Sequence, residues 1–303
     1  MLCNGCVAIK IVLKYGKKGG GNMDSVNRYG VKVEHDTAVA GNSRIGMHEH
    51  DFYELYFLVS GNRRYLMGHT VYDVAPGDMV FVPKKQLHRT TSADKTGYDR
   101  YVLYFSDRQA GALSASLGEE AFSELMNSGC MVLPKHVSEE IQRDLERISR
   151  DIGNPDAMTD IFVTHLLRGI ILNAARYGVQ RQSLAGESAD KVQMVAKYIT
   201  ENYPQEITLA EAAQMACLEK TYFSKRFKQL TGFGFQEYLL QTRILAAERL
   251  LAESQFSVGQ IAEKCGFSSG NYFGDVFQRY KGLSPSEYRK RYQKQPLFIP
   301  VKD

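Results

Sequence analysis

The feature that most constrains this 303-residue chain is an internal repeat within residues 207–292. The two copies, residues 209–233 and 258–283, align when one residue is inserted near Gly270. The matched positions include Ala213 with Ala262, Tyr222 with Tyr272, Phe223 with Phe273, Phe227 with Phe277, and Gly232 with Gly282. A repeat of this length indicates that one supersecondary unit is used twice.

Each copy predicts two short helices joined by a tight turn. Thr208 with Glu211, and Ser257 with Gln260, have the spacing of a capping box, in which two side chains satisfy free amides at a helix start. Small and apolar residues then recur at helical spacing. Gly266 falls at the turn of the second copy, where glycine tolerates a left-handed backbone.

The second helix of each copy has one apolar face, built around Phe223 and Phe227 or around Phe273 and Phe277. Its other face is polar, as a helix needs if its outer side chains are to contact base edges in the major groove. Residues 235–251 form an apolar-rich helix that sets the spacing between the two helix-turn-helix units.

The second copy and the residues after it, S-V-G-Q-I-A-E-K-C-G-F-S-S-G-N-Y-F and F-Q-R-Y-K-G-L-S-P-S-E-Y-R, span residues 257–289. Together with the first copy they resemble the DNA-binding domain of the AraC/XylS family of bacterial transcription regulators. The resemblance implies binding to a double-stranded DNA operator, a homodimer, and contact with RNA polymerase by an activator.

Position by position, the resemblance predicts the residues that contact DNA. The second unit departs from the family at Gly274 and Asp275, where a polar or basic residue is usual, so we expect it to bind more weakly. Lys225 could reach guanine, Asn271 adenine and Asp275 cytosine. The predicted DNA-binding residues are Lys220, Thr221, Ser224, Lys225, Arg226, Lys228, Asn271, Asp275, Gln278, Arg279 and Lys281.

Residues 31–106 follow a different pattern, that of short strands separated by Gly and Pro turns. We expect strands at residues 52–59, 64–67, 71–74, 79–83 and 100–105. Many short strands of this kind are typical of a sandwich or barrel. The order H-x-H-x-x-x-E, then P-G-D, then P-x-x-x-x-H resembles the cupin barrel, and more narrowly the N-terminal effector domain of AraC-type regulators.

Strand alternation predicts that His48, His50, Glu54 and Tyr56 share one face and point into the barrel, where His88 joins them from another strand. Three interpretations fit. The His and Glu side chains are the ligands that catalytic cupins use for Fe, Mn or Zn; they are the polar groups of an effector pocket; or they close turns and bond to each other.

We adopt the effector pocket, with no metal and no cofactor, because regulators of this resemblance commonly keep the histidines without an ion. A sugar is the commonest effector of the family. The predicted effector-binding residues are Arg44, His48, His50, Glu54, Tyr56, Tyr65 and His88.

Two apolar-patterned helices are predicted between these regions, at residues 137–152 and 158–177. They pack on the barrel or present an apolar stripe, including Leu166 and Ile170, to a second subunit. The expected organisation is a disordered leader at residues 1–30, with Met23 as the natural start, a cupin-like barrel at 31–135, a helical dimerisation region at 136–178, a flexible linker at 179–189 and the helix-turn-helix domain at 190–295.

Charge and hydropathy agree with this organisation. From Lys191 onward 16 Lys and Arg residues stand against 11 Asp and Glu residues, so the basic excess lies where phosphates would be met. Because the sequence has neither a membrane-length apolar run nor a signal peptide, we expect a cytoplasmic protein. The expected fold class is multi-domain α and β. We expect the protein to be an effector-controlled transcription regulator without enzymatic activity. The alternative is a metal-dependent cupin enzyme fused to a DNA-binding module.

Overall fold

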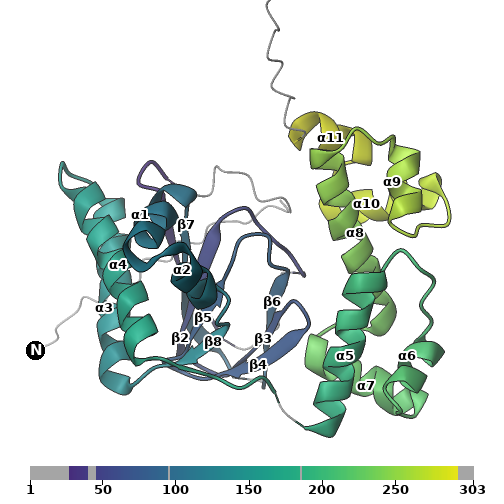
Figure 1. Cartoon of the computed structure of the whole chain (residues 1–303), viewed down its shortest axis with the longest axis horizontal. Coiled ribbons are helices and arrows are strands. Elements are labelled where there is room, and N and C mark those ends of the chain that lie inside the picture. Colours follow the sequence, from purple (N-terminus) through teal and green to yellow (C-terminus); the bar gives the residue numbers. More distant parts are fainter. Residues whose placement is uncertain (1–26, 40–45, 95, 185, 293–303) are drawn as a thin grey trace, which may run out of the picture.

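The computed structural model describes residues 27–39, 46–94, 96–184 and 186–292. The predicted leader at residues 1–30 therefore lies almost wholly outside the described residues, and Arg44 also lies outside them. The chain forms a strand-rich N-terminal domain and an all-helical C-terminal domain, which lie side by side (Figure 1). Among the described residues, no helix is long and apolar enough to cross a membrane.

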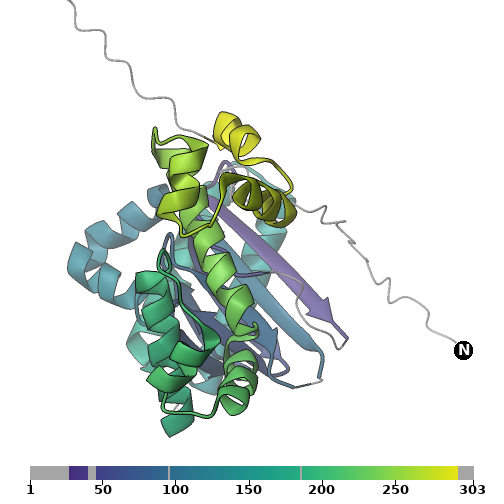
Figure 2. The ribbon, with the colours of Figure 1, turned by 90° about the vertical axis from the view of Figure 1, so that its right-hand side faces the viewer.

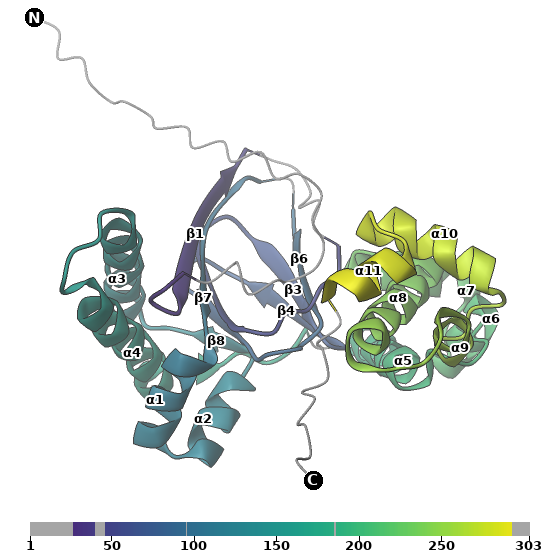
Figure 3. The same ribbon diagram turned by 90° about the horizontal axis from the view of Figure 1, so that it is seen from above.

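Two antiparallel sheets face each other in the N-terminal domain and form an open barrel (Figure 3). The larger sheet has the order β1-β7-β2-β5-β8-β9 and the smaller one β4-β3-β6. The strands are β1 (Val31–Ala38), β2 (Tyr53–Ser60), β3 (Arg63–Met67), β4 (Thr70–Val74), β5 (Met79–Val82), β6 (His88–Ser92), β7 (Tyr98–Phe105), β8 (Cys130–Val132) and β9 (Val179–Gln180).

All five strands expected from the sequence are present, each within two residues of its predicted bounds. The sequence analysis did not predict β1, β6, β8 and β9 as strands. The H-R-T-T-S residues of β6 lack the apolar alternation that marks a half-buried strand. The sequence analysis also missed helices α1 (Asp107–Leu117) and α2 (Glu119–Met126).

Four helices cover the outer face of the larger sheet: α1, α2, α3 (Lys135–Gly153) and α4 (Thr159–Tyr177) (Figure 3). Their apolar side chains and those of the sheet form one core. Leu166 and Ile170 lie in this core and are almost fully buried, so they cannot form an exposed stripe. The exposed apolar residues on and beside α4 are instead Met158, Ile161, Phe162 and Leu172.

The first residues of the predicted flexible linker belong to the larger sheet of the barrel. Val179 and Gln180 form β9, which pairs with β8, and the Leu184 amide donates to the Val71 carbonyl at 2.7 Å. This backbone pairing fixes the direction in which the chain leaves the barrel. The following helix, α5 (Glu187–Asn202), begins within the predicted linker.

The C-terminal domain contains the two predicted helix-turn-helix units on either side of one long helix (Figure 2). Both capping boxes are formed, at Thr208 and at Ser257. Gly232 and Gly282 end the second helices in the left-handed conformation. The helices are α6 (Leu209–Met215), α7 (Lys220–Thr231), α8 (Phe235–Glu253), α9 (Val258–Lys264), α10 (Gly270–Lys281) and α11 (Pro285–Tyr292).

Candidate effector site and DNA-reading surface

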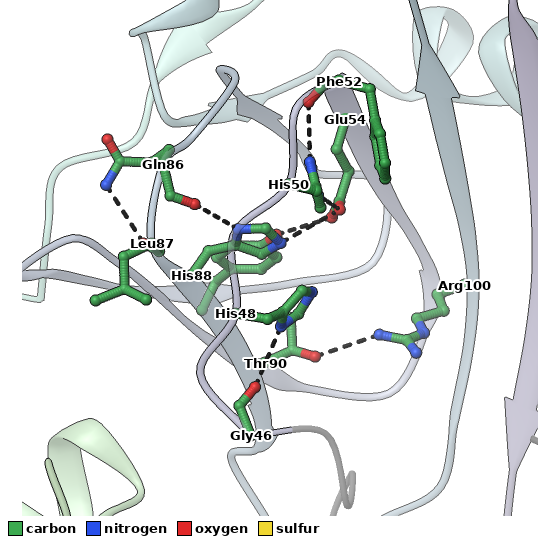
Figure 4. Close-up of polar contacts among 11 residues, drawn as sticks. Gly46, His48, His50, Phe52, Glu54, Gln86, Leu87, His88, Thr90 and Arg100 are labelled. Atoms are coloured by element: carbon green, nitrogen blue, oxygen red, sulfur yellow. Dashed lines mark hydrogen bonds and ion pairs between the residues drawn. The ribbon is translucent and has the colours of Figure 1, made fainter. Parts of the chain in front are cut away.

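Three histidines and a glutamate meet inside the barrel, between the two sheets (Figure 4). Glu54 lies on β2 and His88 begins β6, while His48 and His50 precede β2. An isolated bridge pairs the backbones of His48 and His88, with His48 N–H to His88 O at 3.2 Å and the reverse bond at 2.9 Å. This bridge closes the barrel and carries His48 and His50 to the other two residues, as alternation predicted.

The three imidazoles share one hydrogen-bond arrangement. Each Nδ1 lies within hydrogen-bond distance of a backbone carbonyl: Gly46 at 3.1 Å for His48, Phe52 at 2.9 Å for His50 and Gln86 at 2.8 Å for His88. A carbonyl only accepts, so these contacts place a proton on every Nδ1. Each Nε2 atom is thereby left free to bind at the centre of the cluster. Glu54 Oε2 lies 2.9 Å from His50 Nε2 and 3.3 Å from His88 Nε2.

The electrostatics follow from burial and from this pairing. Burial opposes the charge of Glu54, but His88 and His50 outweigh it and hold the pKa of Glu54 well below its usual range. Burial also opposes a charged His88, yet Glu54 raises the pKa of His88 overall. Burial, followed by His88, lowers the pKa of His48 to about 3. At neutral pH the site therefore holds an ionised carboxylate and a neutral His48.

The donor set fits a divalent transition-metal ion. One ligand atom from each of His48, His50, Glu54 and His88 lies within 4.8 Å of the other three. Bonds of about 2.0–2.2 Å place two ligands of one ion up to about 4.4 Å apart, so the most widely separated donor atoms would have to draw together slightly around an ion. The backbone carbonyls on each Nδ1 are the kind of outer contact that orients metal-binding histidines. An ion held here would supply a Lewis acid for the oxygen of a bound molecule.

Both tyrosines of the predicted site are buried beside this cluster. The Tyr65 hydroxyl donates to Glu54 Oε1 at 2.9 Å, and the Tyr56 ring lies 5.2 Å from the Tyr65 ring. The sequence analysis missed Arg63, Thr90 and Arg100, which are also buried in the barrel. The period of two could have found Arg63 from Tyr65 on the same strand, and Thr90 from His88.

The candidate DNA-reading surface consists of the exposed sides of α7 and α10. In the first unit Lys220, Thr221, Lys225 and Lys228 are exposed and Ser224 is half-buried. Arg226 is held by its own domain, because its Nε donates to Ser188 Oγ at 3.1 Å and its Nη1 to Gln229 Oε1 at 2.9 Å. Four predicted side chains of this unit are therefore free to reach DNA.

In the second unit Asn271, Asp275, Gln278 and Arg279 are exposed. Lys281 is not available to phosphate as predicted, since its largely buried side chain pairs with Glu248 of α8. The sequence analysis matched Tyr222 with Tyr272 in the repeat but assigned no role to them. Tyr222 and Tyr272 occupy equivalent positions in the repeat, and each side chain is about half exposed, at 50% and 48%.

The helix-turn-helix domain packs against the barrel through a set of residues that we call the docking face: Met47, Glu49, Arg64 and Arg89. Glu49 forms a two-pronged ion pair with Arg249 of α8, and the Met47 amide donates to Gln241 Oε1 at 3.1 Å. These contacts alternate with His48 and His50, which point the other way.

The second half of the docking face contacts the end of α7. Arg89 follows His88 on β6, and its guanidinium lies 3.8 Å from the centre of the Phe233 ring while Nη1 donates to the Gly232 carbonyl at 3.3 Å. Arg64 Nη1 donates to the Gln229 carbonyl at 2.9 Å. Met47 also belongs to the hydrophobic core of the first helix-turn-helix unit.

Comparison with known proteins matches both domains. Residues 33–171 match the family model of the AraC-like ligand binding domain, and residues 212–291 match that of a helix-turn-helix domain. The HTH-type transcriptional activator RhaR of Pectobacterium atrosepticum is 28% identical over 253 residues, which cover 81% of this chain and 86% of that protein.

The RhaR of Yersinia pestis, strain Angola, is 24% identical and covers 84% of this chain and 88% of its own length. Among solved structures, that of ToxT from Vibrio cholerae is 16% identical, covers 88% of this chain and all of that one, and has a TM-score of 0.35.

Proposed function

Since this chain belongs to the AraC family of transcription regulators, we propose that a small molecule bound in the barrel controls where the two helix-turn-helix units are held on operator DNA. We further propose that the protein activates transcription through RNA polymerase, as the relatives named transcriptional activators suggest. The exposed Lys225 and Asn271 would read base edges, and the neighbouring lysines would bind phosphate.

One observation carries this proposal: the segments that build the candidate effector site also build the docking face. His48 and His50 point into the barrel while Glu49, between them, binds Arg249 of the reader domain. His88 points into the barrel while Arg89, next to it, contacts Gly232 and Phe233. A ligand that moves either backbone therefore changes contacts with α7 or α8. A ligand shifts such an equilibrium only by its difference in affinity for the two arrangements, about 1–3 kcal/mol in typical cases.

Substitutions inside the barrel test the proposal. Glu54→Ala and His88→Ala should blunt effector-dependent expression of a reporter, while the effector-free protein still retards operator DNA. His35→Ala is the matched control, because His35 is a partly exposed histidine on β1 that stacks on Tyr101, outside the cluster. Barrel variants that respond like the wild type would restrict the barrel to a structural role.

The convergence of four donor atoms favours a second candidate function, a metal-dependent cupin enzyme fused to the DNA-binding module. Metal analysis of the purified full chain separates the two. Stoichiometric Fe, Mn or Zn that is lost in His50→Ala, together with turnover of a substrate, would favour the enzyme. An ion without turnover would make the metal part of the effector site.

We also propose a homodimer, formed through the exposed residues Met158, Ile161, Phe162 and Leu172 of the α4 region. They recur at helical spacing on the side of α4 that faces away from the sheet. Exposed apolar side chains gathered on one helix face are commonly covered in an assembly.

A further inference from the structure

Two arginines lie inside the barrel next to the histidine cluster, and among the described residues only one of them has a carboxylate partner. Arg100 on β7 donates to Asp36 Oδ2 at 3.0 Å. Arg63, at the start of β3, forms no ion pair with any carboxylate among the described residues, although only 1% of the residue is exposed. A buried charge without a counter-charge is costly, so unpaired examples are rare unless a ligand completes them.

The two guanidinium groups converge instead of avoiding each other. Thr90 Oγ1 accepts from Arg100 Nη1 at 3.2 Å and lies 3.5 Å from Arg63 Nη2. Both guanidinium groups also lie over the Tyr98 ring, at 4.2 Å for Arg63 and 5.2 Å for Arg100. Arg63 otherwise meets neutral groups, since its Nη1 donates to Ser92 Oγ at 2.9 Å. An oxygen anion beside Thr90 would bind both guanidinium groups more strongly than a hydroxyl does.

Two buried polar atoms around this point lack a hydrogen-bond partner among the described residues, the Nε atoms of Arg63 and Arg100. The Tyr56 hydroxyl lies against both guanidinium groups, and the Tyr56 ring is 5.6 Å from the Arg100 guanidinium. Burial lowers the pKa of Arg63, and Arg100 lowers it further. Unsatisfied buried donors around an excess positive charge are typical of a binding site that an anionic group completes.

A pocket of about 370 Å³ opens where β3 begins, and Arg63 is in its lining. The other arginines of this pocket are already neutralised, Arg64 by Asp73 at 2.8 Å and Arg181 by Asp78 at 2.6 Å. Asp94, also in the lining, accepts from Asn62 at 2.9 Å and from Thr96. Arg63 is thus the arginine of this lining that has no carboxylate partner among the described residues. Arg100 and Thr90 are absent from the lining, so Arg63 is the point that the pocket shares with the arginine pair.

We propose that the effector carries a carboxylate group, which binds Arg63 and Arg100, on a hydroxylated carbon chain or ring such as that of a sugar acid. Two guanidinium groups and one aspartate leave one negative charge missing, and a carboxylate supplies one charge in the fork geometry that arginine prefers. The hydroxyls of Tyr56, Thr90 and Tyr98 are placed to bond with hydroxyls of the ligand. This inference rests on the proposed function only in taking the barrel as the effector site.

Calorimetry of the purified full chain tests the proposal with matched ligands. Galacturonate, glucuronate and gluconate are titrated against galactose, glucose and glucitol, which lack the carboxylate, and glucose 6-phosphate provides a phosphate arm. We expect at least one acid to bind and its neutral counterpart to bind at least tenfold more weakly. Arg63→Gln should weaken acid binding about tenfold to a hundredfold, because a charge-assisted hydrogen bond is lost.

Arg181→Gln is the matched control, since it removes the same charge from the lining of the same pocket but from a side chain already paired with Asp78. If Arg63→Gln does not fold, as judged by its melting curve, Arg100→Gln is measured instead. The proposal is overturned if no acid binds, if neutral sugars bind equally well, if glucose 6-phosphate binds more tightly than every acid, or if Arg181→Gln has the larger effect.

Operator retardation by the same preparations keeps this test separate from the proposed function. If the chain retards DNA but binds no acid, the carboxylate proposal fails and the proposed regulatory function stands. If the chain binds an acid but retards no DNA, the carboxylate proposal stands and the proposed regulatory function fails.

Discussion

The ion pair between Glu49 and Arg249 should set how firmly the reader domain is docked, and reversing its charges measures this. Glu49 stands between two residues of the candidate effector site, and Arg249 lies on the helix that joins the two helix-turn-helix units. The Glu49 side chain is 13% exposed and that of Arg249 48%, so the pair is only partly screened by water.

The magnitude follows from this partial exposure. Exposed ion pairs contribute about 0.2–1 kcal/mol, and two-pronged arginine–carboxylate geometry places this pair near the upper end. A loss of about 1 kcal/mol is about a fivefold change in the equilibrium between docked and undocked arrangements. Like charges at the same place, in Glu49→Arg or Arg249→Glu, add repulsion and should exceed that change.

Fluorescence anisotropy with operator DNA, on the effector-free full chain, provides the assay. Each single reversal should change operator affinity about fivefold or more, and the double reversal should return it to within about twofold of wild type, because the ion pair is restored. Reversal of Lys135 and Glu139, a pair on α3 remote from the reader domain, is the control. If the effects of the two reversals simply add in the double variant, the two residues do not act through each other and the docking argument fails.

Four further predictions follow from individual contacts. Lys225→Ala should weaken operator binding by about 1–3 kcal/mol and relax the preference at one base pair, whereas Asp275→Ala should cost little or tighten binding. Fluorescence anisotropy with base-substituted operators measures both effects, and the opposite ranking of the two variants would make the second unit the reader. Gly266→Ala should destabilise the domain by about 1–3 kcal/mol in urea unfolding, because φ is +77° and the new Cβ would meet the Pro204 carbonyl oxygen at 2.4 Å. Gly259→Ala on α9, where a new Cβ would meet Ser257 Oγ in ordinary contact at 3.9 Å, should be neutral or stabilising. The pKa of Glu54 is lower in the folded state than its unfolded value of 4.5, so the Glu54 charge stabilises the fold above that pH. The free energy of unfolding of the wild type should therefore exceed that of Glu54→Gln by less and less as the pH falls below 4.5, and a difference unchanged from pH 7 to pH 3.5 would contradict this. Phe162→Glu should dissociate the dimer in sedimentation while the buried Leu166→Ala lowers stability instead, and a dimer unaffected by Phe162→Glu would place the interface elsewhere.

Much of the reader domain could be predicted from the sequence because its determinants are close together in the chain. A capping box spans four residues, so Thr208 with Glu211 and Ser257 with Gln260 gave both helix starts. The repeat supplied a second, independent copy of every argument. The histidines of the barrel were grouped in the same way, because alternation along one extended segment needs no knowledge of its partner strand.

The same local reasoning could not say which partner a charged side chain finds. Lys281 and Arg226 carry the right charge at the right helical positions, but Glu248 and Ser188 occupy them from other helices. The apolar pattern of α4 fits either a sheet or a second subunit, and only packing placed Leu166 inward and Phe162 outward.

Only the tertiary structure placed the candidate ligand site on one side of the barrel segments and the docking face on the other. Glu49 and Arg249 are separated by 200 residues, and Arg89 and Gly232 by 143. Arg63 and Arg100 meet only because β3 and β7 lie in sheets that face each other. Caps, turns and alternation are set by the backbone geometry of neighbouring residues, so the sequence determined them by itself. Charge neutralisation and burial depend on groups brought together through space, and for these only the folded chain could decide.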